Sequence, residues 1–142
     1  MSARIDRFEG DYAFLSNFAL IQGGVLFEGA RYPSVEHAFA AAKTLDPAGR
    51  ELIRALPSAG AAKRAGRTVS LRPDWYEARL GVMEDLLRQK FAVEPFRAAL
   101  AATGSATLIE GNNWGDRFWG VDGSGENHLG KLLMELRAEL TR

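Results

Sequence analysis

Glu36 and Lys43 are an acid and an amine separated by seven residues. Seven residues make nearly two turns of an α-helix, so both side chains would line the same helix face. If that face borders a cleft, Glu36 could activate water or stabilise a cation, while Lys43 binds an anion or acts as an amine nucleophile. The alternative is that Glu36 only complements the helix dipole and that Lys43 is a solvated surface lysine.

A locally basic stretch follows this pair. The chain has no acid between Ala55 and Pro73, but it has four cationic side chains there: Lys63, Arg64, Arg67 and Arg72. Guanidinium groups and backbone N–H groups can together hold a phosphate. The Gly66-Arg67 pair at an expected helix end is the more specific part of this signal. A solvated basic face is the alternative for Lys63 and Arg64.

Periodicity vanishes from Glu110 to Asn127, where the sequence contains five glycines and two tryptophans. Loops of this length in a compact domain tend to be functional or disordered, and the tryptophans argue against disorder. Trp114 and Trp119 could sandwich a planar heterocycle, with Asp116 supplying a carboxylate. Amide contacts could come from Asn112, Asn113 or Asn127. The alternative for one of the two indoles is a core plug under the loop.

Several other chemistries lack their sequence signals. The chain has no cysteine, and its two histidines, His37 and His128, do not have the spacing of a metal pair, so no metal or cofactor is expected. It also lacks the GxSxG, GxGxxG and GxxxxGK[ST] motifs. Lys plus Arg and Asp plus Glu both number 18, so any anion site must be local. Without a leader-like start or a long apolar run, we expect a cytoplasmic protein that does not cross a membrane.

The elements that must position these residues fit one globular domain of 142 residues. Each of the five prolines is followed by an expected helix and marks its start, because proline is tolerated in a first helical turn. Ser34 is the expected N-cap of the helix after Pro33. The predicted elements are a hairpin or meander between Asn17 and Pro33, helices in 34–45, from Asp46-Pro47 to about Leu56, from Pro57-Ser58 to near Gly66, from Asp74 to near Phe91 and from Pro95 to Gly104, a strand at 107–109, and a helix over 128–140.

Taken in order, several segments resemble the YbiA-like family, also called NADAR. These segments are Phe14–Phe18 (FLSNF), Tyr32–Lys43 (YPSVEHAFAAAK), Ala65–Arg67, Lys90-Phe91, Thr107–Gly120 (TLIEGNNWGDRFWG) and Gly125–Arg137 (GENHLGKLLMELR). The resemblance spans nearly the whole chain, and the combination of SNF, SxEH and NxLGxxLMxxR is specific. Tyr32 stands where the family often has Trp.

The resemblance implies a compact, mostly helical α+β domain with a small β component that hydrolyses an N-glycosidic bond to ribose. Family members act on phosphoribosylated pyrimidine intermediates of riboflavin synthesis or remove ADP-ribose from guanine bases, so the expected partner is a ribosyl phosphate or an ADP-ribosylated nucleobase, including one within nucleic acid. The resemblance makes Glu36 and Lys43 the catalytic pair. The expected substrate contacts are Asn17, Phe18, Gly66, Arg67, Trp114, Asp116, Trp119, Gly120 and Asn127. The alternative function is a non-catalytic module that binds ADP-ribose or NAD.

Overall fold

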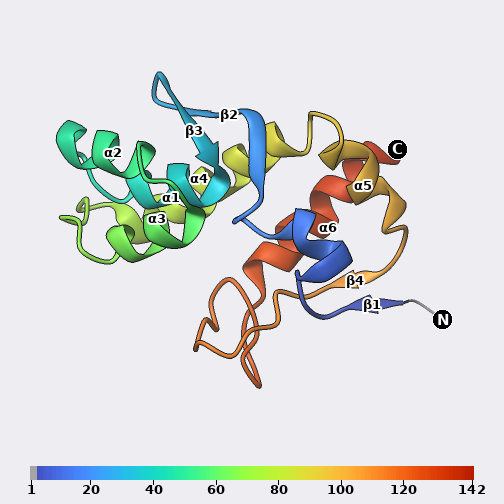
Figure 1. Ribbon diagram of the computed structural model, residues 1–142. Helices are drawn as coiled ribbons and strands as arrows, with labels where there is room; N and C mark the ends of the chain where they lie inside the picture. Colours follow the sequence, from blue (N-terminus) through green and yellow to red (C-terminus); the bar gives the residue numbers. More distant parts are fainter. Residues whose placement is uncertain (1–2) are drawn as a thin grey trace. The chain divides into compact units, whose positions relative to one another are not determined.

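The computed structural model of the protein describes residues 3–142, which form two compact units. Unit 1 comprises residues 3–16 and 91–142, and unit 2 comprises residues 17–90. Figure 1 shows their helices and strands. The single domain expected from chain length stays a prediction, and each unit is described by itself.

Unit 2 contains the hairpin strands β2 (Leu20–Phe27) and β3 (Ala30–Ser34), followed by α1 (Val35–Ala42), α2 (Pro47–Arg54), α3 (Ala59–Gly66) and α4 (Trp75–Lys90). The strands pair antiparallel, from Phe27 opposite Ala30 back to Leu20 opposite Ser34. This confirms the predicted hairpin. The register shifts between Leu20 and Val25, where Gly24 has a φ of +67° and its missing Cβ leaves room for the carbonyl of Tyr32.

Helix α1 is the central element of unit 2. Seven of its eight residues are buried, and it packs on the hairpin, α2, α3 and α4. The hydroxyl of Ser34 accepts a hydrogen bond from the backbone N–H of His37 at 3.1 Å, which confirms the predicted N-cap. Alanines favour this helix and let its neighbours approach closely.

The next three helices confirm the predicted starts, with one error in the predicted core. The side chains of Asp46 and Ser58 cap α2 and α3. The helical spacing of Trp75, Leu80, Met83, Leu87 and Phe91 predicts one buried side for α4. Trp75 is buried as this spacing predicts, but Leu80 is 39% exposed and its predicted burial is wrong. Leu80 lies about 140° round the helix from Trp75 and only about 20° from Leu87, which is buried, so it lies at the edge of the buried face. Leu86 is buried instead.

Unit 1 contains β1 (Arg4–Ile5), the 3-10 helix η1 (Gly10–Leu15), α5 (Phe96–Ala102), β4 (Thr107–Leu108) and α6 (His128–Leu140). Strands β1 and β4 pair in parallel, with Ile5 opposite Leu108. The predicted α5, β4 and α6 are confirmed, whereas β1 and η1 were not predicted, because both are too short to show periodicity. Small sheets on a mostly helical chain agree with the expected fold class. None of the described helices is long and apolar enough to span a membrane.

Candidate functional site

Glu36 is the one residue of α1 that is not buried. It lies in the first turn, where the helix dipole favours its negative charge. Its backbone N–H donates to the carbonyl of Asn17 at 3.1 Å, which fixes the start of α1 to the segment before the hairpin. A rigid, otherwise buried helix therefore presents a single carboxylate.

Lys43 follows the last residue of α1 as its C-cap and is half-buried. Burial is the largest influence on its amine and lowers its pKa. The carboxylate of Glu36 raises the pKa of Lys43, whereas the charges of Arg67 and Lys63 lower it. The carboxylate of Glu36 and the three cations Lys43, Lys63 and Arg67 thus interact electrostatically within unit 2. Their net positive charge favours the binding of an anion.

Gly66 brings α3 close to this amine. A Cβ on Gly66 would lie 3.0 Å from the Cβ of Ala40 and 3.7 Å from Nζ of Lys43. The missing side chain therefore permits the close packing of α3 on α1. The next residue, Arg67, is exposed at the end of α3. The predicted Gly66-Arg67 pair is thereby located beside Lys43.

Phe18 and Asn17 lie in the segment that precedes β2. The Phe18 ring is 43% exposed, and Nζ of Lys63 lies 5.7 Å from its centroid. Nδ2 of Asn17 donates to the sulfur of Met83 at 3.6 Å. Among the described residues, Oδ1 of Asn17 is buried without a hydrogen-bond partner. Both residues thus belong to the same unit as Glu36, and Asn17 retains an acceptor for a donor group.

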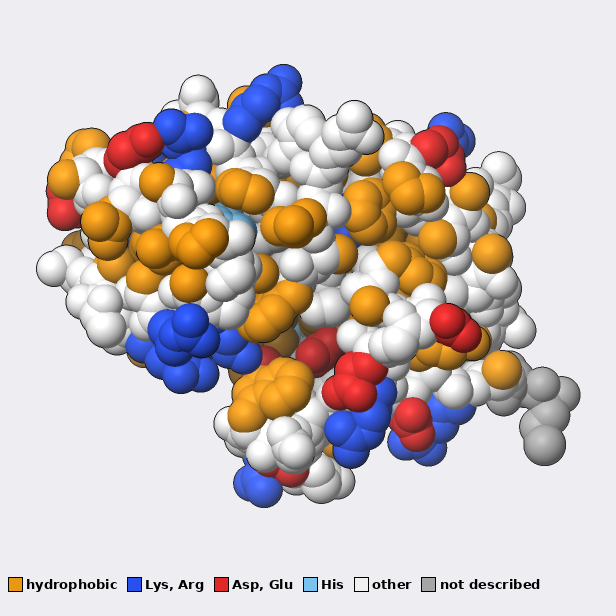
Figure 2. All heavy atoms as spheres, in the orientation of Figure 1, with side chains coloured by type: hydrophobic (Ala, Val, Ile, Leu, Met, Phe, Trp, Pro, Cys, Tyr) orange, Lys and Arg blue, Asp and Glu red, His pale blue; other side chains and the backbone are white. Residues whose placement is uncertain are grey.

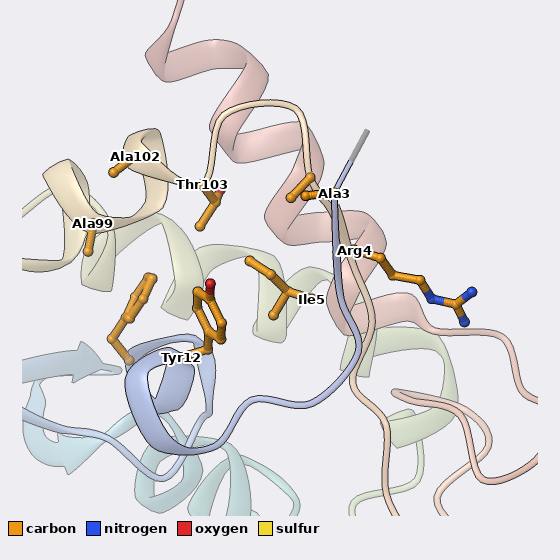
Figure 3. Close-up of a pocket in the computed structure, with 9 residues that line it drawn as sticks. Ala3, Arg4, Ile5, Tyr12, Ala99, Ala102 and Thr103 are labelled. Atoms are coloured by element: carbon orange, nitrogen blue, oxygen red, sulfur yellow. The ribbon is translucent and has the colours of Figure 1, made fainter. Parts of the chain in front are cut away.

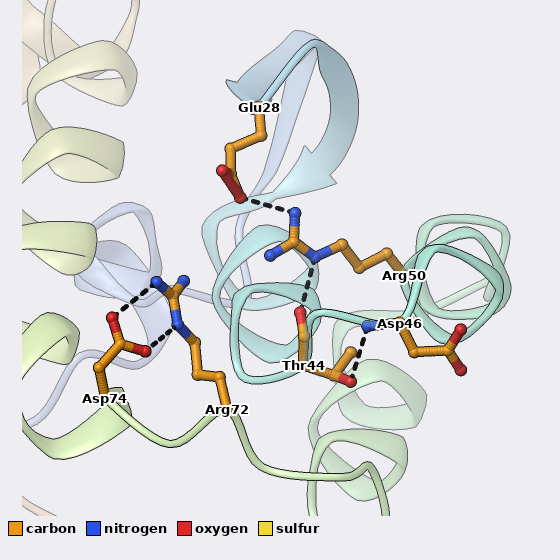
Figure 4. Close-up of polar contacts among 6 residues, drawn as sticks. All are labelled: Glu28, Thr44, Asp46, Arg50, Arg72 and Asp74. Atoms are coloured by element: carbon orange, nitrogen blue, oxygen red, sulfur yellow. Dashed lines mark hydrogen bonds and ion pairs between the residues drawn. The ribbon is translucent and has the colours of Figure 1, made fainter.

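A polar network fixes the chain at the end of α1 (Figure 4). The carbonyl of Lys43 accepts from the backbone N–H of Arg72 at 2.7 Å. The carbonyl of Thr44 accepts from Nε of Arg50 at 2.7 Å, as Figure 4 shows. The guanidinium of Arg72 contacts both carboxylate oxygens of Asp74, at 2.6 and 3.0 Å. Arg72, which the basic stretch offered as an anion contact, is therefore held in an ion pair and serves to position Lys43.

In Figure 2 basic side chains gather at the edge of unit 2 below the region of α3. Lys63 is half-buried, and its charge lowers the pKa of Lys43; a solvated basic face was the alternative prediction for this residue. Arg64 is exposed. The sequence feature that could have identified Lys63 as a neighbour of Arg67 is its position four residues earlier, which places both cations on one side of α3.

In unit 1, the side chains of the Gly/Trp loop bind its own backbone. Oδ1 of Asp116 accepts from the N–H groups of Phe118 and Trp119, at 3.2 and 3.0 Å. Oδ1 of Asn112 accepts from the N–H groups of Trp114 and Asp116, at 3.3 and 3.1 Å. These bonds order a loop that has little regular secondary structure.

The two tryptophans of this loop differ. Trp114 is 51% exposed. Trp119 is half-buried, and its ring lies edge-on to Phe118 at 4.9 Å and near His128 at 6.4 Å. Trp114 thus presents an exposed ring, whereas the ring of Trp119 packs in part on Phe118 and His128, and its predicted substrate contact stays a prediction.

Gly120 and Asn127 have structural contacts of their own. A Cβ on Gly120 would collide with the carbonyl of Glu110. The amide of Asn127 accepts from the N–H of Glu110 and donates to the carbonyl of Leu108, each at 3.0 Å. Both residues therefore hold the loop to the strand before it, and their predicted substrate contacts stay predictions.

A pocket of about 340 Å³ lies elsewhere in unit 1 (Figure 3). Its lining is mostly apolar and includes Ile5, Tyr12 and Thr103, while Arg4 points away from it. None of the predicted site residues lines this pocket. Within residues 3–142, no three His, Asp or Glu side chains gather as ligands for a metal ion.

Comparisons with known proteins support the family resemblance that the sequence motifs indicate. The family model described as the NADAR domain matches residues 6–141. The chain is 42% identical over 135 residues to a protein named N-glycosidase YbiA from Escherichia coli, covering 92% of this chain and 82% of that protein. A riboflavin biosynthesis protein from Vibrio vulnificus is 36% identical over 135 residues, which are 92% of this chain and 36% of that protein.

The fold is also shared with a solved structure. The NMR structure of the E. coli protein YbiA matches with a TM-score of 0.84 at 40% identity, covering 99% of this chain and 87% of that one. This match confirms a mixed, mostly helical fold with small sheets. On the family model and these relatives, the chain belongs to the NADAR family.

Proposed function

We propose that this protein is an N-glycosidase that hydrolyses the bond between a nucleobase-like ring and the C1′ atom of a phosphorylated ribose. The observation that carries the proposal is the electrostatic interaction of Glu36, in the first turn of the otherwise buried α1, with the half-buried amine of Lys43 at the C-cap of the same helix. The relatives named N-glycosidase YbiA support the same reaction class.

Cleavage of the C1′–N bond leaves its electron pair on the departing nitrogen and builds positive charge on the sugar ring. A carboxylate beside C1′ stabilises this charge more in the transition state than in the ground state, which lowers the barrier. In the water route, the oxygen of the attacking water bonds to C1′ while Glu36 takes one of the water's protons. The departing nitrogen takes up a proton from solvent and Glu36 later releases its proton to solvent, so that one water is added across the C1′–N bond. General-base assistance of this kind contributes about 10²–10⁴-fold.

Lys43 has two alternative roles. As a cation it contacts a phosphate of the substrate, together with Arg67. As a neutral amine its nitrogen attacks C1′ directly, the C1′–N bond to the base breaks, and the opened sugar stays attached as an imine that water then hydrolyses. Burial supports the second role, because it lowers the pKa of Lys43 and raises the fraction of neutral amine at a given pH.

Two substrate types suit the same site. The basic groups around Lys43 suit the phosphate of a phosphoribosylaminopyrimidine and equally the diphosphate of ADP-ribose linked to guanine. The relatives named riboflavin biosynthesis proteins support the pyrimidine. A single-stranded or flipped guanine in nucleic acid would also be reachable in principle. A cytoplasmic location is part of this proposal, in keeping with a chain that lacks cysteine.

The loop of unit 1 supplies a second, separate part of the proposal. The exposed ring of Trp114 is suited to stacking on a base, which is worth about 1–3 kcal/mol for each base in nucleic-acid complexes. Trp119, Gly120, Asp116 and Asn127 order the loop around it. Their role as direct substrate contacts remains a proposal.

The test is a side-by-side assay of base release from guanine-linked ADP-ribose and from phosphoribosylaminopyrimidines. The proposal expects hydrolysis of at least one of them by the wild type. Tight calorimetric binding of ADP-ribose without hydrolysis of any ribosylated substrate would instead support the non-catalytic module.

Borohydride reduction during turnover separates the two routes. The imine route predicts a stable adduct with the mass of the sugar product on Lys43, found by peptide mass spectrometry. No adduct under conditions of confirmed turnover supports the water route.

A further inference from the structure

His37 follows Glu36 in α1, and its side chain is fully buried. Its Nε2 lies 3.0 Å from the carbonyl oxygen of Leu56, and its Nδ1 lies 2.7 Å from the hydroxyl oxygen of Ser34. The backbone N–H of His37 donates to the same hydroxyl oxygen at 3.1 Å. Both ring nitrogens therefore have partners within unit 2.

These partners fix the tautomer of the ring. A carbonyl only accepts hydrogen bonds, so Nε2 of His37 carries a proton and donates to Leu56. Nδ1 of the neutral ring is then an acceptor and receives the hydroxyl proton of Ser34. The hydroxyl of Ser34 thus accepts from the backbone N–H of His37 and donates to Nδ1, and the ring is held in one orientation.

The same partners join two segments of unit 2. Ser34 ends β3 and caps α1. Leu56 lies between the end of α2 at Arg54 and the cap of α3 at Ser58. The imidazole of His37 thus ties the first turn of α1 to the segment that leads into α3.

Helix α3 carries the groups that act on Lys43. The charges of Lys63 and Arg67 lower the pKa of Lys43, and a Cβ on Gly66 would lie 3.7 Å from its Nζ. Because Glu36 and Lys43 lie on α1, the placement of α3 against α1 sets the distances between the acid, the amine and the anion-binding cations. A displacement of about 1 Å between such groups can lower a rate by about 10²-fold.

We propose that His37 is a positioning residue: through its Nε2–H bond to Leu56 it holds the cations of α3 at a fixed distance from Glu36 and Lys43, without contacting the substrate. The proposal rests on the proposed N-glycosidase function. The Ser34 contact orients the ring, and the Leu56 contact transmits its position to α3.

Two substitutions at this position separate the two contacts. His37→Gln places an amide nitrogen three bonds beyond Cβ, as in the imidazole, and keeps a donor for Leu56. His37→Asn places an amide oxygen two bonds beyond Cβ and keeps only an acceptor for Ser34. Each variant removes one polar contact from the same buried place, so similar losses in Tm are expected. We expect His37→Gln to keep kcat within about threefold, whereas His37→Asn lowers kcat at least tenfold with a smaller change in KM.

A second readout needs no turnover. The pH dependence of acylation at Lys43, followed by peptide mass spectrometry, reports the pKa of its amine in each variant. Movement of α3 changes the influence of Lys63 and Arg67, so His37→Asn shifts this pKa and His37→Gln does not. If the wild type hydrolyses none of the ribosylated substrates, the proposed function fails while this titration still tests the positioning role.

Two results would overturn the proposal. One is a loss of kcat that does not differ between His37→Gln and His37→Asn beyond what the difference in their Tm values explains. The other is obtained without any substitution: ¹⁵N NMR of the wild-type imidazole that finds the proton on Nδ1 contradicts the contact with Leu56. Should His37→Asn fail to fold, Ser34→Ala serves as the second variant. It keeps the Leu56 contact and is expected to retain kcat within about threefold despite a lower Tm.

Discussion

The carboxylate of Glu36 raises the pKa of Lys43, in opposition to burial, which is the larger influence and lowers it. The two residues lie at opposite ends of α1, which fixes their spacing. A rigid helix thus couples an acid that can stabilise a cation with an amine whose neutral form is favoured by its surroundings. This coupling is open to direct measurement.

Removal of the charge at position 36 should lower the pKa of Lys43 further. Glu36→Gln deletes the influence that raises this pKa, whereas Arg67→Ala deletes one that lowers it, so the two variants should shift it in opposite directions. The pH dependence of Lys43 acylation measures both shifts. Arg88→Ala, at an exposed ion pair with Glu84 on α4, is the control and should leave the value unchanged. Shifts of the same sign in Glu36→Gln and Arg67→Ala would contradict the coupling.

Gly66 is expected to tolerate even a methyl group poorly. A Cβ there would lie 3.0 Å from the Cβ of Ala40, so Gly66→Ala must displace α3 by a few tenths of an ångström, with a loss of about 1–3 kcal/mol in the free energy of unfolding. Gly81→Ala is the matched control, since nothing lies within 4 Å of its Cβ on α4. It should stabilise the protein by up to about 1 kcal/mol. Chemical denaturation measures both, and equal stabilisation would argue against the close packing of α3 on α1.

Lys90, the last residue of α4, is fully buried, and burial lowers its pKa from 10.5 to about 7. Because its pKa is lower in the folded state, folding releases a proton between pH 7 and 10.5, and stability falls as the pH is lowered through this range. The slope from one group is at most about 1.4 kcal/mol per pH unit. Lys90→Met should remove this slope. Urea unfolding at pH 7 and pH 9 checks the prediction, and the same slope in both proteins would contradict it.

Asp116 offers a test of whether its charge or its hydrogen bonds matter. Its Oδ1 accepts from two backbone N–H groups, and Asp116→Asn keeps an acceptor oxygen at that place. If the residue orders the loop, Asp116→Asn should retain most activity, while Asp116→Ala should increase amide hydrogen exchange at Phe118 and Trp119 and lower activity. A full loss of activity in Asp116→Asn would point instead to a charged contact with substrate.

The sequence predicted the helices with strong start signals and the place of Glu36 in the first turn of one of them, but the helix expected within 34–45 ends at Ala42 and Lys43 is its C-cap. Ser34, Asp46 and Ser58 are caps whose chemistry is local, and local chemistry can be read from one sequence. The parallel pairing of Ile5 with Leu108 was missed, because contacts between residues a hundred positions apart leave no local periodicity.

The roles of individual site residues were harder to predict for the same reason. The contact between His37 and Leu56 and the close approach of Gly66 to Lys43 both depend on how α3 packs on α1. Spacing along one helix cannot give that distance. The side chains of Asp116 and Asn127 were expected to face a substrate, but Asp116 accepts from backbone groups of its own loop, and Asn127 bonds the backbone of Glu110 and of Leu108 in β4.

The most direct measurement is the turnover of Glu36→Gln on whichever ribosylated substrate the wild type hydrolyses. Gln has nearly the same shape and keeps the backbone N–H that donates to Asn17, so the fold and the affinity for substrate should persist. A carboxylate that stabilises the charge at C1′ predicts a fall in kcat of about 10²–10⁴-fold. Turnover close to that of the wild type would remove Glu36 from the mechanism.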